Sequence, residues 1–234
     1  MRRHIPNFIT LLNLFLGCLA IVAVLHGDYR LTFWLIVFAI FADYVDGGVA
    51  RALKVTSPLG KELDSIADTV SFGVVPGAIF YQLLSLSTNC PSNVICWAAI
   101  PAFVLSAAAG LRLARFNLDT RQTDTFIGLP TPSMTVFSLG LLMIHEYNYF
   151  GMGPILEETW VLYLLVGFLS YILNAPLPMF NLKFKSFTWK GNEIKFIFIA
   201  VGLTLLALFR EASFALVIAL YILVSVVIHF FRKK

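Results

Sequence analysis

Long apolar stretches alternate with short polar breaks along almost the whole chain. The breaks are rich in Gly, Pro, Asn and charged residues, as at Gly27-Asp28 and Ser57-Pro58. An α-helix needs about 20 predominantly apolar residues to cross the hydrocarbon core of a bilayer. The pattern therefore predicts an all-α integral membrane protein with about eight transmembrane helices. The expected spans are 7–26, 31–52, 64–86, 94–116, 132–149, 160–179, 193–208 and 212–231.

The composition supports this interpretation. Apolar residues make up 59% of the 234 residues and charged residues 13%, about half the roughly 25% of an ordinary soluble domain. The mean hydropathy is +0.85. These values exclude a soluble globular enzyme, a disordered chain and a disulfide-stapled secreted scaffold. Eight helices with short connections use almost the whole chain, so we expect one membrane-embedded domain over residues 1–234.

The positive charges predict the orientation, because cytoplasmic loops carry an excess of Lys and Arg. With both termini in the cytoplasm and eight helices threaded, all of the 17 Lys and Arg residues except Arg30 and Arg210 lie on the cytoplasmic side. A different number of helices would scatter these residues over both faces. We therefore expect a multi-pass protein of the cytoplasmic membrane with both termini inside.

The three cysteines do not form a metal-binding motif. Cys18 lies within an apolar stretch, and we expect it to pack there. Cys90 and Cys96 flank a predicted loop and can pair if that loop faces an oxidising compartment.

Four aspartates interrupt the hydrophobic pattern on either side of one short turn. Asp43 and Asp46 are three residues apart at the predicted cytoplasmic end of the second helix, and Asp64 and Asp68 are four apart at the start of the third. Each pair therefore shares one helix face. Asp43 precedes Arg51 by eight residues, which is roughly 12 Å along a helix. The two carboxylate pairs are expected to converge below the cytoplasmic end of the helices.

Carboxylates at this depth need counter-charges. An Asp within the membrane costs about 2.5–3.5 kcal/mol on an insertion scale, and four of them repel one another unless they bind cations or protons. Hard ions such as Mg²⁺ accept several carboxylate oxygens and favour phosphate as a further ligand. Gly47 and Ala50 remove side-chain bulk beside the cluster, and Arg51 offers a fork-shaped donor for phosphate. These residues indicate metal-assisted phosphoryl transfer at the cytoplasmic face.

Two alternatives stay open for the acidic cluster. The acids can lie at the membrane interface and pair with Arg51, Lys54 and Lys61. Intramembrane carboxylates also mark ion pathways, so an ion transporter is a rival of a different class. Against it, the sequence lacks the helix-breaking Gly and Pro that transporters carry at mid-membrane in paired halves.

The string D-x2-D-G-x2-A-R-x8-G-x3-D-x3-D resembles the signature of the CDP-alcohol phosphotransferases. Its fixed positions are Asp43, Asp46, Gly47, Ala50, Arg51, Gly60, Asp64 and Asp68. The resemblance implies a membrane enzyme, usually a homodimer, that displaces CMP from a CDP-linked donor by an alcohol. It implies that the four aspartates hold two divalent metal ions, Mg²⁺ or Mn²⁺, and that Asp68 is also the general base. The nucleotide and its phosphates are then held by Gly47, Ala50, Arg51 and Gly60.

Three further segments resemble the phosphatidylserine synthases within that family. They are residues 6–13 with Asn7 and Thr10, residues 112–117 with Arg112, Arg115 and Asn117, and residues 126–132. The resemblance implies transfer of the phosphatidyl group from CDP-diacylglycerol to the hydroxyl of L-serine, with release of CMP. The resemblance places Asn7 and Thr10 at the nucleotide. It places Arg112, Arg115 and Asn117 at the lipid phosphate or the serine.

The residues alone leave several of these roles open. Arg112 and Arg115 suit phosphate or carboxylate recognition and positive-inside anchoring equally well, and Asn7 and Thr10 suit helix caps equally well. The residues 128–130 favour a helix-entry turn. Other acceptors, glycerol 3-phosphate or inositol phosphate, and an ether-lipid donor remain alternatives, although anionic acceptors would need an extra basic pocket. We expect a single direct displacement, because the sequence shows no obvious activated Ser, Cys or His.

Overall fold

The structure, a computed structural model, describes residues 4–55, 57–91, 93–118, 127–180, 188–189 and 192–232. These residues form helices, together with an isolated β-bridge between Ile127 and Pro178. Short 3₁₀ or π-helical segments occur at Thr69–Val74, Trp97–Phe103, Tyr149–Gly151 and Arg210–Ala212. The α-helices are α1 (Ile5–Leu25), α2 (Tyr29–Leu53), α3 (Pro58–Asp68), α4 (Val75–Ser87), α5 (Val104–Leu118), α6 (Thr131–Tyr147), α7 (Gly153–Leu156), α8 (Thr159–Asn174), α9 (Glu193–Phe209) and α10 (Ser213–Arg232).

Each of the eight predicted spans coincides with a long helical segment, but some boundaries differ. The third helix begins at Pro58 rather than at residue 64, because the Ser57 hydroxyl accepts a hydrogen bond from the Gly60 N–H and proline suits a first helical turn. The sixth span ends at Asn174 rather than at residue 179. Ala175 precedes a proline and is extended, with a ψ of 143°, as the proline ring requires.

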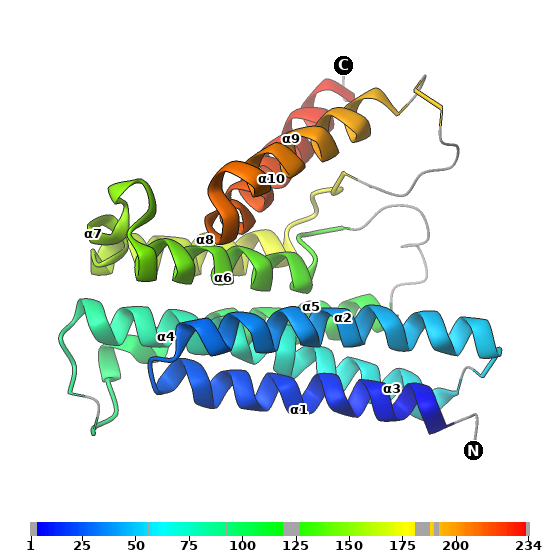
Figure 1. Cartoon of the computed structure of the whole chain (residues 1–234), viewed down its shortest axis with the longest axis horizontal. Helices are drawn as coiled ribbons and strands as arrows, with labels where there is room; N and C mark the ends of the chain where they lie inside the picture. Colours follow the sequence, from blue (N-terminus) through cyan, green and yellow to red (C-terminus); the bar gives the residue numbers. More distant parts are fainter. Residues whose placement is uncertain are drawn as a thin grey trace.

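Five segments are long and apolar enough to cross a membrane, which confirms the all-α membrane class. One of them, Glu193–Phe230, contains both α9 and α10, which fold back against each other (Figure 1). α6 and α8 are shorter, with 17 and 16 residues. The number of eight crossings therefore stays a prediction. The chain ends at 1–3 and 233–234, for which the charges predict a cytoplasmic location, lie outside the described residues.

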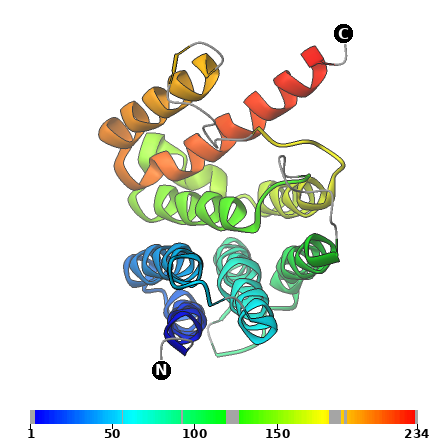
Figure 2. The same cartoon turned by 90° about the vertical axis from the view of Figure 1, so that its right-hand side faces the viewer.

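The helices form a bundle around the continuous helix 58–87. In Figure 2, α1, α2, α3–α4 and α5 form one group, α6 and α8 pack above it, and the α9–α10 pair lies beyond α6. In the most apolar stretch of helix 58–87, 61% of the residues are buried, whereas in the corresponding stretch of α1 only 33% are buried. The outer helix faces carry large exposed apolar side chains such as Phe8, Phe15 and Phe41, as lipid contact requires.

The two ends of the bundle differ in chemistry. α2 and α5 end, and α3 and α6 begin, at the right-hand end in Figure 1, which we call the acidic end because it holds the four aspartates. At the opposite end Cys90 and Cys96 form a disulfide, the pairing that the sequence allows. Cys18 does not pack in the interior as expected. It is exposed, because the buried stripe of α1 runs through Asn13 and Gly17 and leaves Cys18 on the outer face.

Candidate active site

A tight connection between α2 and α3 brings the two aspartate pairs together. α2 ends at Leu53, and Lys54 adopts a left-handed conformation with a φ of 54° that reverses the chain. The capped start of α3 follows within a few residues. The acidic face at the end of α2 therefore meets the acidic face at the start of α3.

Three of the predicted metal ligands converge at this meeting point. One carboxylate oxygen from each of Asp43, Asp64 and Asp68 lies within 4.8 Å of the other two, and all three residues are partly buried. Asp43 comes from α2 and the other two from α3. This geometry agrees with the convergence that the helical spacing predicts.

The fourth aspartate, Asp46, is bound by α1. Oγ1 of Thr10 donates a hydrogen bond of 2.5 Å to Oδ2 of Asp46 and lies 3.1 Å from the carbonyl oxygen of Pro6. Asp46 is buried, so this bond satisfies an oxygen that would otherwise lose its water. Thr10 therefore connects α1 to the aspartate cluster and is not the N-cap of α1, which is His4.

The donor set of the cluster fits a hard divalent cation. Asp43, Asp46 and Asp64 all interact electrostatically with Asp68, and Oδ1 of Asp68 is buried without a hydrogen-bond partner among the described residues. Unpaired buried carboxylates are costly, whereas Mg²⁺ and Mn²⁺ readily accept such oxygens as ligands. Directly after Asp68 the helix becomes π-helical over Thr69–Val74, a change of hydrogen-bond register that is frequent at functional sites.

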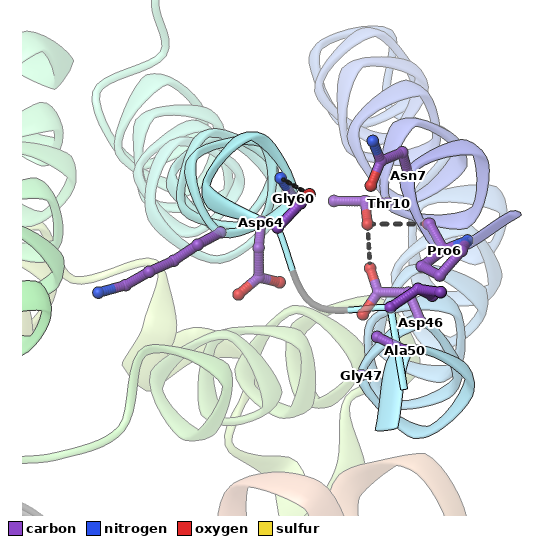
Figure 3. A pocket seen from close by; sticks show the side chains of 11 residues that line it. Pro6, Asn7, Thr10, Asp46, Gly47, Ala50, Gly60 and Asp64 are labelled. Carbon is purple, nitrogen blue, oxygen red and sulfur yellow. Dashed lines mark hydrogen bonds between the residues drawn. The ribbon is translucent and has the colours of Figure 1, made fainter. Parts of the chain in front are cut away.

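A cavity of about 220 Å³ lies beside the aspartates, between α1, α2 and α3 (Figure 3). Asp46 and Asp64 line it from two different helices. The cavity also gathers residues that the sequence assigns to the nucleotide, namely Asn7, Thr10, Gly47, Ala50 and Gly60. Further lining residues, for which the sequence predicts no such role, are Pro6, Val55, Ser57 and Lys61. The Ser57-Pro58 pair, the N-cap and first residue of α3, is a helix-start signal that could have identified Ser57.

Two glycines allow close approach at the cavity. A Cβ atom at Gly60 would lie 3.2 Å from both Oδ1 of Asn7 and Oγ of Ser57, tighter than ordinary van der Waals contact. A Cβ atom at Gly47 would lie 3.3 Å from Nη1 of Arg51. Arg51, predicted to hold phosphate, therefore folds across Gly47 at the edge of the cavity.

The three residues predicted for the lipid phosphate or the serine separate into different environments. Arg112 on α5 is 7% exposed, its Nε atom has no hydrogen-bond partner among the described residues, and it interacts electrostatically with Asp68. Arg115 is exposed. Nδ2 of Asn117 donates a 2.7 Å hydrogen bond to Oγ of Ser65 on α3. The structure thus buries Arg112 on α5, leaves Arg115 at the surface and uses Asn117 to join α5 to α3.

Comparison with known proteins agrees with the signature. The profile of the CDP-alcohol phosphatidyltransferase family matches residues 3–173. A relative from Helicobacter pylori is 31% identical over 95% of this chain and 89% of its own length, and one from Methanocaldococcus jannaschii is 31% identical over 97% and 94%. A Bacillus subtilis relative is 36% identical over 65% and 79%. All three are named CDP-diacylglycerol–serine O-phosphatidyltransferase. The chain belongs to the CDP-alcohol phosphatidyltransferase family.

Proposed function

We propose that this protein transfers the phosphatidyl group from CDP-diacylglycerol to the hydroxyl of L-serine and releases CMP. Relatives named for that reaction align with nearly the whole chain, which supports the assignment. The observation that carries it is the convergence of Asp43, Asp64 and Asp68 beside a cavity lined by glycines of the family signature.

The reaction is a direct displacement at phosphorus. The serine hydroxyl oxygen forms a bond with the phosphorus that carries diacylglycerol, the bond from that phosphorus to the CMP oxygen breaks, and CMP leaves. Asp68 accepts the hydroxyl proton as general base. Its buried Oδ1, which has no partner among the described residues, is suited to this role.

The four aspartates would hold two divalent ions, Mg²⁺ or Mn²⁺. When bound, such ions neutralise the charge of the diphosphate and of the departing CMP. The chain's own residues would position the rest of the donor. Asn7, Thr10 and Gly60 line the cavity that we assign to the nucleotide, and Arg51 lies at its edge, where it can bind phosphate.

Arg112 supports serine as the acceptor. It is the only buried cationic side chain among the described residues, and it interacts electrostatically with the proposed base, Asp68. One guanidinium matches the single carboxylate of serine. Glycerol 3-phosphate or an inositol phosphate carries more negative charge and would need further cations. Exposed Arg115 suits a lipid phosphate at the membrane surface.

We place the acidic end at the cytoplasmic face of the cell membrane. The distribution of Lys and Arg supports this orientation. The disulfide between Cys90 and Cys96 at the opposite end also supports it, because disulfides persist in oxidising compartments. The homodimer that the family resemblance implies stays a prediction.

The test is an acceptor panel with purified protein, CDP-diacylglycerol and Mg²⁺ or Mn²⁺. L-serine, glycerol 3-phosphate and inositol phosphate are offered one at a time while CMP is measured, and fast release is expected with serine alone. Asp43→Asn should abolish the release. The matched control is Asp28→Asn at the other end of α2, where the carboxylate caps the helix through the Leu31 N–H and Asn caps equally well.

Two results would change the assignment. Equal or faster CMP release with glycerol 3-phosphate would replace the acceptor. Metal-ion flux through proteoliposomes without CMP release for any acceptor would make the protein a transporter.

A further inference from the structure

Asn13 on α1 is buried without a hydrogen-bond partner for its side chain. The residue is 0% exposed, and neither Nδ2 nor Oδ1 of its amide has a partner among the described residues. Within the part of the chain that the structure describes, no other side chain leaves two buried polar atoms unpaired. A buried amide without hydrogen bonds costs free energy. A polar group kept at this cost points to a function.

Two contacts join α1 to α3 and its π-helical continuation, and they fix the height of Asn13 in the bundle. Both helices begin at the acidic end and run in the same direction (Figure 1). Near their start, a Cβ atom at Gly60 would lie 3.2 Å from Oδ1 of Asn7. Further along, Oγ of Ser71 donates a 3.1 Å hydrogen bond to the carbonyl oxygen of Asn13, and a Cβ atom at Gly17 would collide with the same hydroxyl.

These contacts place Asp64 and Asp68 beside the turn of α1 that carries Thr10 and Asn13. Both aspartates lie between the two contacts in the sequence. Thr10 and Asn13 belong to the buried stripe of α1. The side chains of a helix tilt towards its N-terminus, so the Asn13 amide points back towards the acidic end, where the aspartates lie.

An unused donor and an unused acceptor remain at this height. The Thr10 hydroxyl is taken, because it donates to Asp46 (Figure 3). Nδ2 of Asn13 and Oδ1 of Asp68 are both buried without a partner among the described residues. An amide N–H is a natural donor to a carboxylate oxygen, and a hydrogen bond to an ionised group is about twice as strong as a neutral one. One buried water molecule between the two atoms would complete both of them.

We propose that Asn13 is a positioning residue for Asp68. Its Nδ2 donates a hydrogen bond to Oδ1 of Asp68, bridged by one buried water molecule, and this bond holds the carboxylate towards the acceptor hydroxyl. A carboxylate oxygen has two acceptor positions, so the bond from Asn13 leaves one free for the proton of the hydroxyl. The inference rests on the proposed transfer to serine and names a residue that orients its general base.

Asn13→Leu tests this role, because leucine has nearly the shape of asparagine and lacks both polar atoms. We expect kcat for CMP release to fall about ten- to a hundredfold, as for loss of a group that orients a charged side chain at the site. The KM for CDP-diacylglycerol should stay within roughly twofold. The thermal midpoint should stay the same or rise, because an apolar side chain replaces an amide that the described residues leave unpaired.

A second background shows whether Asn13 acts through Asp68. When Asp68 is already Asn, no base remains to be oriented, so Asn13→Leu should lower the residual kcat by less than about twofold. Titration of the protein with Mn²⁺ alone gives a readout besides activity. Asn13→Leu should leave the Mn²⁺ affinity almost unchanged, because Asn13 is not a ligand, whereas Asp43→Asn should weaken it.

Thr135→Val on α6 is the matched control, because it also replaces a buried polar side chain by an apolar one of the same shape. The Thr135 hydroxyl donates a 3.2 Å hydrogen bond to the carbonyl oxygen of Phe72, in the same π-helical segment as Ser71. This variant should show the opposite pattern, a lower thermal midpoint and a kcat within roughly twofold of the wild type. If Asn13→Leu yields no folded protein, Asn13→Ala takes its place with the same expected loss of kcat.

The inference is overturned if the Asn13 variant keeps normal kcat, loses Mn²⁺ binding, or lowers kcat by the same factor with and without the Asp68 carboxylate. It is also overturned if Thr135→Val lowers kcat equally. If the wild-type protein releases no CMP with serine, the proposed function fails and the inference fails with it. Serine-dependent release by the wild type, together with equal effects of Asn13→Leu in both backgrounds, refutes the inference alone.

Discussion

Replacing Asp68 with Asn separates proton transfer from metal binding in the aspartate cluster. The change keeps the size and shape of the side chain and removes its ability to accept a proton. Asp68 is the member of the cluster with a buried oxygen that has no partner among the described residues, and it interacts electrostatically with the inward-facing Arg112. Its loss should therefore act mainly on the chemical step.

The expected size follows from these roles. A general base typically contributes about 10²–10⁴-fold, or roughly 3–5.5 kcal/mol of transition-state stabilisation, so Asp68→Asn should lower kcat by at least a hundredfold. Asp43, Asp46 and Asp64 would remain for metal and nucleotide. Asp43, in contrast, is the only α2 residue among the three described aspartates whose carboxylate oxygens lie within 4.8 Å of one another. Asp43→Asn should therefore weaken both metal and donor binding.

The assay measures CDP-diacylglycerol binding by titration and turnover by CMP release for each variant at saturating Mn²⁺. Some loss of metal affinity is expected for Asp68→Asn, because Asp68 is also placed among the ligands. Near-normal turnover of this variant would refute the general-base role. Loss of donor binding as complete as in Asp43→Asn would show that Asp68 is a ligand alone.

Three further predictions concern packing, orientation and metal. Gly17→Ala should destabilise the protein by about 1–3 kcal/mol, seen as a lower thermal midpoint in detergent, because its Cβ would collide with Ser71 in the π-helical segment Thr69–Val74. Gly110→Ala should not lower the midpoint, because a Cβ atom at Gly110 would have no atom within 4 Å. Equal midpoints for the two variants would contradict the described packing at Gly17. In intact cells, the partly exposed Cys90 should react with a membrane-impermeant thiol reagent after mild reduction, and a C-terminal reporter should stay inside. Labelling from the cytoplasmic side alone would reverse the orientation. Chelation should abolish CMP release and Mg²⁺ or Mn²⁺ should restore it, whereas full activity in chelator would exclude the metal-dependent mechanism.

The positions of the helices could be predicted because the membrane imposes a simple condition on the sequence. A segment that lies in hydrocarbon must be apolar and helical over about 20 residues, so the polar breaks mark the connections. This condition does not determine the exact residue at which a helix begins or ends. Ser57 and Pro58 read as a break but form the capped start of α3, and the sixth span continues as an extended segment after Asn174.

The site could be predicted where its chemistry lies within one helix. The spacing of Asp43 and Asp46 on α2, with the matching pair on α3, is enough to place each pair on one face. Contacts between helices far apart in sequence leave no such pattern. Neither the bond from Thr10 to Asp46 nor the bond from Asn117 to Ser65 could be read from periodicity, because each depends on how separate helices pack.

The most direct test of the account follows the serine itself. Purified protein is supplied with CDP-diacylglycerol, Mn²⁺ and isotopically labelled L-serine, and both CMP and label in the lipid fraction are quantified. The account predicts equal amounts of CMP and labelled phosphatidylserine with the wild-type protein, and neither product with Asp43→Asn. CMP release without labelled lipid, or no CMP release with serine, would contradict it.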